Sequence, residues 1–574
     1  MSESEPSRDP YSASTLHASS ESASVAGQAI HDSSLTLTSK EIRSKVDGNK
    51  VEESEPQKKD ARFWLVFLSL CVSLFLAAIE LVAVSVALPT IAKDLHANED
   101  FIWVTSAYAL SSTALIPASG GIAEIFGRRA SILTALLVFM LGSALCGSAR
   151  NMHWLIAGRT IQGAGGGGIL SITAIILSDI VTLKERGIYN GILGLVWAVT
   201  CILGPIVGGS FAKSGNWRWV FYMNLPIAGF ALILVVTCLH LKTTTQSLRD
   251  KFARIDWIGN FIVTSSTTSI VLSLTWGGTT YPWSSAQVLT PLILGVVGLL
   301  SFGFYEFNFA REPIMPYQLV SNLTSLSGYI QNFIITLVLM TGIFWVPTFY
   351  QACYNASPIH SGVLFLPTCG VVGFCIVAGG VSVAATKRYR PQIWFSWAIV
   401  VVATGLISTL RADSTIHYAI GVPILLAMGI GILSSTTYFP VLTPLPVSAN
   451  AHALALFSFL RQFAGVWSIT IGSAILDNRL ASNLPKTFLD QLNGRASTAY
   501  ANIPLIASLE EPTRTQVRIA FADSLSMVWK VMIGISSIGL LASLVMKGLP
   551  LHSERDEKWG LEEAKKADGI KQQV

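Results

Sequence analysis

The sequence predicts an all-α membrane protein with fourteen transmembrane helices, on three observations. Of its 574 residues, 51% are hydrophobic and 13% are charged, whereas about a quarter of a soluble domain is charged. The mean hydropathy is +0.54. Charged residues concentrate in 1–62 and 548–574. One large membrane domain is therefore expected between two polar tails, with a lipid bilayer as its solvent.

A hydrocarbon core of about 30 Å needs about 20 apolar helical residues, and the charge-poor stretches divide at that length. A charged connector at 242–256 separates six spans from the rest, and the turn at 277–282 divides the next pair. The expected spans are 63–89, 102–122, 131–149, 154–178, 188–211, 219–240, two within 257–305, two within 313–386, 391–410, 416–437, 453–475 and 526–546.

An even number of spans places both tails on one side, and Lys and Arg favour the cytoplasmic side of short loops. With the tails inside, the short inner loops hold twelve such residues and the short outer loops five. Both termini are therefore expected in the cytoplasm, and 477–525 becomes a long external loop. Residues 1–62 are Ser- and Glu-rich without a signal peptide, so they are expected to form a disordered cytoplasmic tail.

An internal repeat divides the membrane domain. Gly121 precedes the pair Arg128-Arg129 by seven residues, and Gly380 precedes Lys387 by the same spacing. If the spans within 241–312 are an insertion, the chain consists of six spans (63–240), two extra spans, and six more (313–547), followed by a tail at 548–574. Repeated halves around a midplane cavity are typical of transporters.

Several other classes of protein lack support. The seven cysteines form no CxxC pair and lie mostly in apolar runs, so no metal site is expected. The stretch 163–168 matches GxGxxG, but it lies inside an apolar helix rather than after a soluble strand. Without a phosphate loop, an HExxH motif or a Ser-His-Asp set, neither a cofactor nor enzymatic activity is expected. The net charge of +5 is too small and too spread to indicate nucleic-acid binding.

A specific family resemblance rests on the motifs. Residues 121–129 resemble a G-x-x-x-D-R-x-G-R-R loop, 155–167 a fourth-span pattern that contains Arg159, and 204–209 an antiporter pattern in the fifth span. Further matching segments are 87–89, 217–226, 346–351 and 357–358. On these residues the chain resembles the major facilitator superfamily, in particular its fourteen-span drug:proton antiporter branch common in fungi, over 63–547. The resemblance implies two pseudo-symmetric bundles that exchange exported compounds for protons by alternating access.

Two positions depart from the family pattern. Glu124-Ile125 stands where the loop pattern has Asp-Arg, so the acid is one methylene longer and a basic group is missing. A weaker network of gating ion pairs is expected there. In the first span, Glu80 is followed by apolar residues where the branch has threonines, so a polar contact to substrate or proton is missing.

Ionisable residues inside spans are costly and are functional candidates by default. Glu80 and Arg159 lie at similar depth, roughly 12 Å and 10 Å below the outer ends of their spans at about 1.5 Å per residue, so they are predicted to pair and to couple protons. A static structural ion pair is the alternative. In the fifth span, glycines allow close helix packing and a proline allows a kink; these residues are Gly204, Pro205, Gly208 and Gly209.

Other candidates follow from position. Conformational gating is expected from Gly121, Glu124, Gly127, Arg128, Arg129 and Asp179, with the arginines pairing with acids at helix ends. A wide apolar cavity with polar handles is expected to be lined by Trp103, Gln162, Trp197, Trp345, Tyr350, Gln351 and Arg461. The outward-facing sequon at Asn355 is a possible glycosylation site.

The expected function is export of small amphipathic or apolar compounds, such as drugs, toxins or secondary metabolites, by proton antiport. The expected form is a monomer in the plasma membrane, with the vacuolar membrane as the alternative. A vacuolar or siderophore-type transporter of charged solutes is a second possibility, although it calls for more intramembrane acids. A non-transporting membrane sensor or membrane-bound enzyme is the third, and the duplicated loop argues against it.

Overall fold

The computed structural model describes residues 60–95, 102–240, 247–278, 280–491 and 503–551. Within these ranges the chain is helical without a β-strand, and fourteen helices are long and apolar enough to cross a membrane. The predicted fold class is thus confirmed. The tails predicted at 1–62 and 548–574 lie almost entirely outside the described residues.

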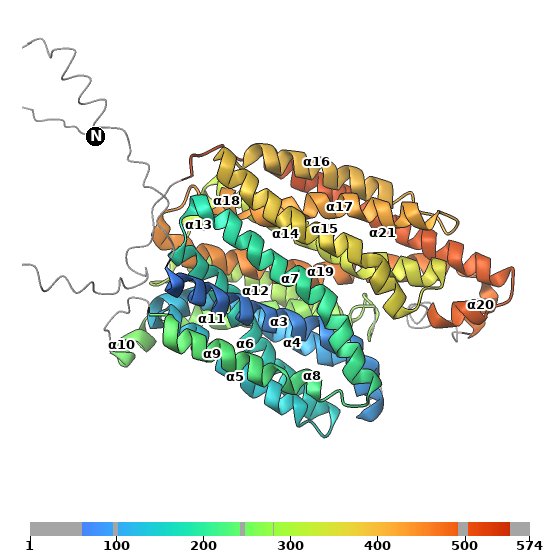
Figure 1. The fold of residues 1–574 in the computed structure, drawn as a ribbon, viewed down its shortest axis with the longest axis horizontal. Helices are drawn as coiled ribbons and strands as arrows, with labels where there is room; N and C mark the ends of the chain where they lie inside the picture. The colour runs from blue at the N-terminus through green and yellow to red at the C-terminus, as the bar shows by residue number, and fades with distance from the viewer. Residues whose placement is uncertain (1–59, 96–101, 241–246, 279, 492–502, 552–574) are drawn as a thin grey trace, which may run out of the picture. The chain divides into compact units, whose positions relative to one another are not determined.

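The N-terminal half is built from six spanning segments (Figure 1). Asn151 caps the fourth of them by accepting a 2.8 Å hydrogen bond from the Trp154 amide, and Gly127 makes the tight link before the third with φ of 90°. Its helices are α3 (Ala61–Asp94), α4 (Ile102–Phe126), α5 (Arg128–Gly147), α6 (Met152–Ile180), α7 (Leu183–Lys213), α8 (Trp219–Tyr222) and α9 (Asn224–Cys238).

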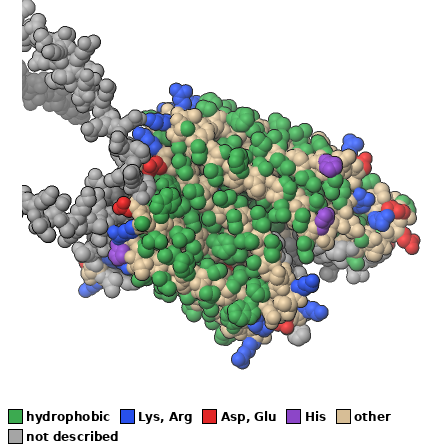
Figure 2. Space-filling model, in the orientation of Figure 1, with side chains coloured by type: hydrophobic (Ala, Val, Ile, Leu, Met, Phe, Trp, Pro, Cys, Tyr) green, Lys and Arg blue, Asp and Glu red, His purple; other side chains and the backbone are tan. Residues whose placement is uncertain are grey.

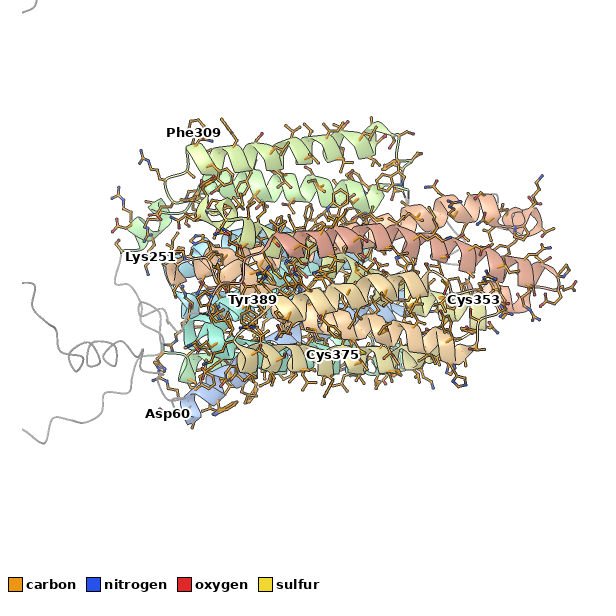
Figure 3. All side chains as sticks on the ribbon, turned by 90° about the horizontal axis from the view of Figure 1, so that it is seen from above. Asp60, Lys251, Phe309, Cys353, Cys375 and Tyr389 are labelled. Atoms are coloured by element: carbon orange, nitrogen blue, oxygen red, sulfur yellow. The ribbon has the colours of Figure 1, made fainter. Side chains whose placement is uncertain are left out.

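An accessory hairpin follows, formed by α11 (Trp257–Trp276) and α12 (Ala286–Asn308) after the short helix α10 (Leu248–Ala253). Asp256 caps α11 by accepting from the Gly259 amide at 2.9 Å. Gly295 of α12 packs on the Ser266 carbonyl of α11 so closely that an added Cβ would lie 2.7 Å away. Figure 3 shows these two helices side by side at one edge of the bundle. Because α11 also packs on α4 and α19, the hairpin bridges the two halves.

The C-terminal half also contains six spanning segments. Ser357 caps the second of its spans through the His360 amide, at 3.2 Å. Its elements are α13 (Gln318–Ser321), α14 (Leu323–Tyr354), α15 (Pro358–Thr386), α16 (Arg390–Ile407), α17 (Ile416–Thr436), α18 (Tyr438–Leu442), η1 (Val447–Ala449), α19 (Asn450–Asn483), α20 (Lys486–Gln491), η3 (Ile503–Ser508) and α21 (Thr513–Val545).

The structure forms helix in both ends of the segment predicted to be a long external loop, 477–525. Helix α19 continues to Asn483 and α21 begins at Thr513, so helix replaces both ends of that loop. Leu476, Leu480 and Leu484 are buried at a four-residue spacing, which is an apolar stripe along one face of a helix. This stripe belongs to the same hydrophobic core as residues of η3 and α21. Packing on that core supports the helices beyond the charge-free stretches.

The outer surface of the bundle matches a lipid environment. In the face shown in Figure 2, hydrophobic side chains cover the middle of the bundle, and Lys, Arg, Asp and Glu gather at its two ends. Large exposed hydrophobic residues are common on it, including Leu300 at 71% and Phe374 at 73%. In water such a surface would associate or aggregate, so the belt confirms a multi-pass membrane protein.

The two halves meet mainly along two helix pairs, α4 with α19 and α7 with α15, and α6 also contacts α19 and α7 contacts α17. At Gly187 of α7 and Gly380 of α15 the two backbones touch directly, because a Cβ added at Gly187 would lie 2.6 Å from the Gly380 carbonyl oxygen. Along α7 the contact continues to Ala198, which faces Gly373. Gly362, nearer the start of α15, has open space beside it. The halves are therefore in contact at the end where α7 begins.

Candidate functional site

Glu80 and Arg159 form an ion pair inside the N-terminal half, as their predicted depths allowed. The Oε1 atom of Glu80 accepts from Nη1 of Arg159 at 2.5 Å, and both side chains are 0% exposed. Glu80 lies on helix α3 and Arg159 on helix α6. Since each charge is removed from water, the pair is tolerable only because the partners compensate each other.

Further donors and acceptors complete the surroundings of the pair. Asn224, the first residue of α9, donates from Nδ2 to the second carboxylate oxygen of Glu80. Arg159 donates from Nε to the Val104 carbonyl at 2.8 Å and from Nη1 to Gln162 Oε1 at 2.7 Å. Gln162, predicted for the cavity, instead lies beside the ion pair and donates to Ser143 at 2.8 Å.

Tyr108 of α4 provides an aromatic wall for the pair. Its ring centroid lies 4.4 Å from the Arg159 guanidinium carbon, which is a cation–π arrangement. The hydroxyl of Tyr108 and the Nη2 atom of Arg159 are buried and have no hydrogen-bond partner among the described residues. A polar cluster that retains unused donors next to a carboxylate is suited to rearrangement when that carboxylate gains a proton.

The glycine-rich stretch of α6 packs helices together. A Cβ at Gly163 would collide with Ser111 and the Tyr108 backbone, and one at Gly166 would collide with the Tyr108 hydroxyl. A Cβ at Gly165 would collide with the backbone of Phe139 in α5. These glycines therefore allow α4 and α5 to approach α6 at the level of the ion pair.

The antiporter-type glycines of α7 lie against the helix that carries Glu80. A Cβ at Gly204 would lie 2.5 Å from Val82, and one at Gly208 would overlap the Ala83 carbonyl. The helix runs through Pro205 without a break, and Gly209 is partly buried next to Gly208. Close packing of α7 on α3 is the property that these residues visibly provide.

The predicted gating residues lie at the end of the bundle where α7 begins. Arg128 donates from Nε to Asp179 at 2.8 Å, and both side chains are at most 2% exposed. Arg129 differs, because its guanidinium donates to the Val236 carbonyl at 2.6 Å. Glu124 pairs across the two halves with Nδ1 of His452 on α19, at 3.2 Å. Gly121 has open space around it.

The predicted cavity residues are spread over both halves. Trp345 and Tyr350 are 6% and 0% exposed in the core of the C-terminal half, where the Tyr350 hydroxyl donates to the Ala419 carbonyl at 3.0 Å. Trp103 stands edge to face with Trp276 at 6.2 Å. The remaining three are partly buried: Trp197 beside the N-terminal core, Gln351 bonded to Ser361, and Arg461 near Phe457.

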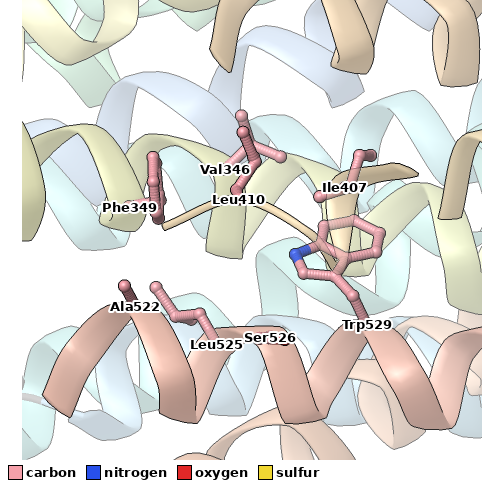
Figure 4. Close-up of a pocket in the computed structure, with 8 residues that line it drawn as sticks. All are labelled: Val346, Phe349, Ile407, Leu410, Ala522, Leu525, Ser526 and Trp529. Atoms are coloured by element: carbon pink, nitrogen blue, oxygen red, sulfur yellow. The ribbon is translucent and has the colours of Figure 1, made fainter. Parts of the chain in front are cut away.

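The pockets lined by described residues include two that differ in size. The first, in Figure 4, has a volume of about 10 Å³ and lies between α14, α16 and α21, so it holds at most about one water molecule. Its lining residues are Val346, Phe349, Ile407, Leu410, Ala522, Leu525, Ser526 and Trp529.

The second pocket is larger, about 160 Å³, and lies between α4, α11 and α19. It contains Gly121, Glu124 and His452 together with Arg254, Asp256 and Glu312. Drug-sized sites usually measure about 300–1,000 Å³, so neither pocket has the size of a closed drug site.

Asn355 ends α14 in the left-handed conformation with φ of 54° and is exposed. Ser357 of the same sequon caps α15 with its hydroxyl. Glycosylation at Asn355 stays a prediction.

Sequence reasoning missed Tyr108, Asn224 and His452. Asn224 lies in the quoted 217–226 motif, and all three are polar residues within or at the ends of apolar stretches. Their positions in the sequence do not show which partner each one reaches.

Two six-helix halves, an apolar belt and a charged pair enclosed within one half define a multi-pass membrane transporter. Comparison with known proteins agrees. The family model described as Major Facilitator Superfamily matches residues 70–469, so this chain belongs to that family. It is 37% identical over 548 residues to the MFS-type efflux pump LUC4 of Fusarium sp, covering 94% of this chain and 97% of that protein.

Other relatives have similar names. The efflux pump FUS6 of Gibberella fujikuroi is 37% identical over 89% of this chain and 94% of its own. A transporter from the acurin A biosynthesis cluster of Aspergillus aculeatus is also 37% identical, over 89% of this chain and 94% of its own. These relatives are fungal transporters rather than enzymes.

Solved structures support the fold alone. The proton:xylose symporter XylE superposes with a TM-score of 0.54 at 12% identity, over 85% of this chain and 98% of that one. The human organic anion transporter MFSD10 superposes with a TM-score of 0.53 at 12% identity, over 83% and 100%.

Proposed function

We propose that this transporter exports small amphipathic or apolar compounds, such as drugs, toxins or secondary metabolites, in exchange for protons. The observation that carries the proposal is the Glu80–Arg159 pair, in which a fully buried carboxylate is held by one guanidinium and one amide. Such a group changes its charge, its partner and its hydration together when it binds a proton.

The chemistry that we propose uses residues already in contact. A proton that adds to a carboxylate oxygen of Glu80 makes a neutral acid and removes the attraction to Arg159. The arginine keeps its contacts with Gln162 and Val104 and with the Tyr108 ring. Loss of the proton on the other side of the membrane restores the ion pair. If the two states favour different arrangements of α3 and α6, proton transfer is coupled to rocking of the halves.

The inner-end contacts support a role in gating. With the tails placed in the cytoplasm, the Arg128–Asp179 and Glu124–His452 pairs and the Gly187–Gly380 contact all lie on the cytoplasmic side. We propose that they hold the cytoplasmic entrance closed in this conformation, in which the transporter releases cargo to the outside.

The glycine contacts support a path for the motion. Gly204 and Gly208 let α7 lie on the helix that bears Glu80, while Gly187 of the same helix contacts the other half. Helix α7 thereby links the protonation site to the contact between the halves.

Export is favoured over import because the relatives carry the names of efflux pumps. We propose a monomer in the plasma membrane with both termini in the cytoplasm, and the vacuolar membrane is the alternative. Trp103, Trp197, Gln351 and Arg461 remain proposed cavity residues for an opened state.

A carrier of charged solutes is less favoured, because Glu80 is already neutralised by Arg159. A non-transporting sensor is less favoured, because the relatives carry the names of efflux pumps and transporters.

The proposal is tested by accumulation of a fluorescent, uncharged apolar compound in cells that lack their own pumps, with and without a proton uncoupler. Wild type is expected to keep the dye low only without uncoupler. Glu80→Gln is expected to lose most of this export while remaining folded and in the membrane. Glu511→Gln, an isosteric change of an exposed external carboxyl, is the matched control and should export normally.

Export that persists in the presence of uncoupler would refute proton exchange. A Glu80→Gln protein that exports normally would make the Glu80–Arg159 pair a structural element only. The proposed orientation is tested separately with epitope tags at either terminus, which should be undetectable on intact cells.

A further inference from the structure

The inner end of the accessory hairpin contains two facing carboxyl groups that lie outside the Glu80 site. Glu306, near the end of α12, is 3% exposed, and Asp256 caps the start of α11. A Cβ added at Gly259 would touch both groups, at 2.5 Å from Glu306 Oε1 and closer still to Asp256 Oδ2. The two side chains are therefore close enough to hydrogen-bond to each other.

The other oxygen of each carboxyl group is already used. Asp256 Oδ1 accepts from the Gly259 amide at 2.9 Å and from the Tyr305 hydroxyl at 3.2 Å. Glu306 Oε2 accepts from the Met315 amide at 3.1 Å. The facing oxygens, Asp256 Oδ2 and Glu306 Oε1, have no donor among the described residues.

Two buried acceptors that face each other without a hydrogen atom repel, and two carboxylates at this separation resist double ionisation. A buried oxygen without a donor also loses the hydrogen bond that water would supply. One proton between the two oxygens removes both penalties, because it neutralises one group and makes it a donor to the other.

Nearby cations do not compensate the pair. Arg254 is bound by Glu312 through two hydrogen bonds of 3.1 and 3.2 Å, and this contact raises the pKa of Arg254. His452 pairs with Glu124 on the other side of the same pocket. In the described part of the chain, the charged and titratable groups that line this pocket or touch the pair are Arg254, Glu312, Glu124, His452 and Tyr305, and none of them donates to either facing oxygen.

We propose that Asp256 and Glu306 bind one shared proton, which makes the inner end of the accessory hairpin a second protonation site, separate from Glu80. Asp256 lines the 160 Å³ pocket, which gives the site a route to solvent. Glu306 also holds the connector at Met315 that leads into the C-terminal half. The proton therefore joins α11, α12 and this connector. In Figure 3 this end of the hairpin lies near the labelled Lys251 and Phe309.

The test is infrared spectroscopy of the purified protein at pH 7, where a free carboxyl group is ionised. The absorption of protonated carboxyl groups is compared between wild type, Glu306→Gln, Asp256→Asn and the double variant. Each single variant is expected to lose the intensity of one protonated carboxyl, because the remaining acid then ionises beside a neutral amide. The double variant should lose no more than either single variant.

Glu511→Gln is the control, because it removes an exposed carboxyl that does not line this pocket and leaves Arg254 bound to Glu312, and it should retain the full intensity. Unchanged intensity in both single variants would overturn the proposal, and so would a twofold loss in the double variant. If Glu306→Gln does not fold, Asp256→Asn alone decides, since it removes the same proton. The readout needs no transport, so failure of proton antiport at Glu80 would leave it unaffected.

Discussion

The two six-helix halves share an architecture but differ in the chemistry of what they bury. Among the described residues, the ion pairs with both partners at most 2% exposed, Glu80–Arg159 and Arg128–Asp179, lie in the N-terminal half. The C-terminal half buries a neutral network in which Trp397 donates to Gln331 at 3.0 Å.

This neutral network extends across several helices. Gln331 donates to Ser327 at 2.9 Å, and Asn332 donates to the Phe457 carbonyl at 2.8 Å. Amides and hydroxyls keep their charge as pH changes, whereas a buried carboxylate does not. We infer that protonation of Glu80 acts on the N-terminal half, whereas the hydrogen bonds of this C-terminal network do not change with pH.

The largest expected effect is that of breaking the buried pair on one side. Arg159→Ala leaves Glu80 as a buried charge without its guanidinium, which should destabilise the protein by about 3–5 kcal/mol. Thermal unfolding of the detergent-solubilised protein measures this change. Glu80→Gln combined with Arg159→Gln removes both charges and should recover part of the loss. If Arg159→Ala unfolded at the same temperature as the wild type, the buried ion pair would not distinguish the N-terminal half from the C-terminal half.

A smaller effect is expected where the halves touch. Gly380→Ala adds a methyl group against the Gly187 carbonyl, and overpacking of this kind costs about 1–3 kcal/mol. The cost applies only while the halves are in contact at this point, so the ratio of closed to open protein should fall by about five- to 150-fold. Distances between spin labels at the inner ends of α7 and α15 measure it. Gly405→Ala, where space is open, is the control.

The neutral network predicts a pH-independent loss. Gln331→Leu removes the acceptor of the Trp397 indole and should cost about 1–3 kcal/mol. The loss should be equal at acidic and neutral pH, because the network carries no titratable group. Unfolding curves at two pH values check this, and a loss that changes with pH would contradict the assignment of charge chemistry to the N-terminal half.

The smallest expected effect concerns the pair that joins the halves. Glu124 and His452 are 23% and 16% exposed, and partly exposed polar contacts of this kind contribute about 0–1 kcal/mol. His452→Ala should therefore leave stability nearly unchanged and shift the ratio of closed to open protein by no more than about fivefold. The same spin-label distances measure it. A larger shift would make this pair, rather than the glycine contact, the main closure.

Much of the fold could be predicted because bilayer thickness converts directly into helix length. The pairing of Glu80 with Arg159 was predictable for a related reason, since depth in a span follows from residue number. Their other partners were not, because Tyr108 and Asn224 reach the pair through helix packing that spacing does not encode. His452 lies far from Glu124 in sequence, and only the assembled halves bring them together.

The length of α19 and α21 beyond the apolar runs was not predicted, for another reason. Span counting looks for uninterrupted apolar runs, whereas Leu476, Leu480 and Leu484 form one apolar stripe among polar residues. Such a stripe supports a helix that packs on protein on one side and faces water on the other. Searching for this periodicity would have placed these helix ends more accurately.

The 34 residues of α19 make a rod about 51 Å long at 1.5 Å per residue, against a hydrocarbon layer of about 30 Å. Part of a helix of this length extends beyond the hydrocarbon layer. Every degree through which it swings about its inner end displaces the far tip by about 0.9 Å. A dye attached at that tip would therefore convert small tilts of the C-terminal half into changes large enough to follow in single molecules.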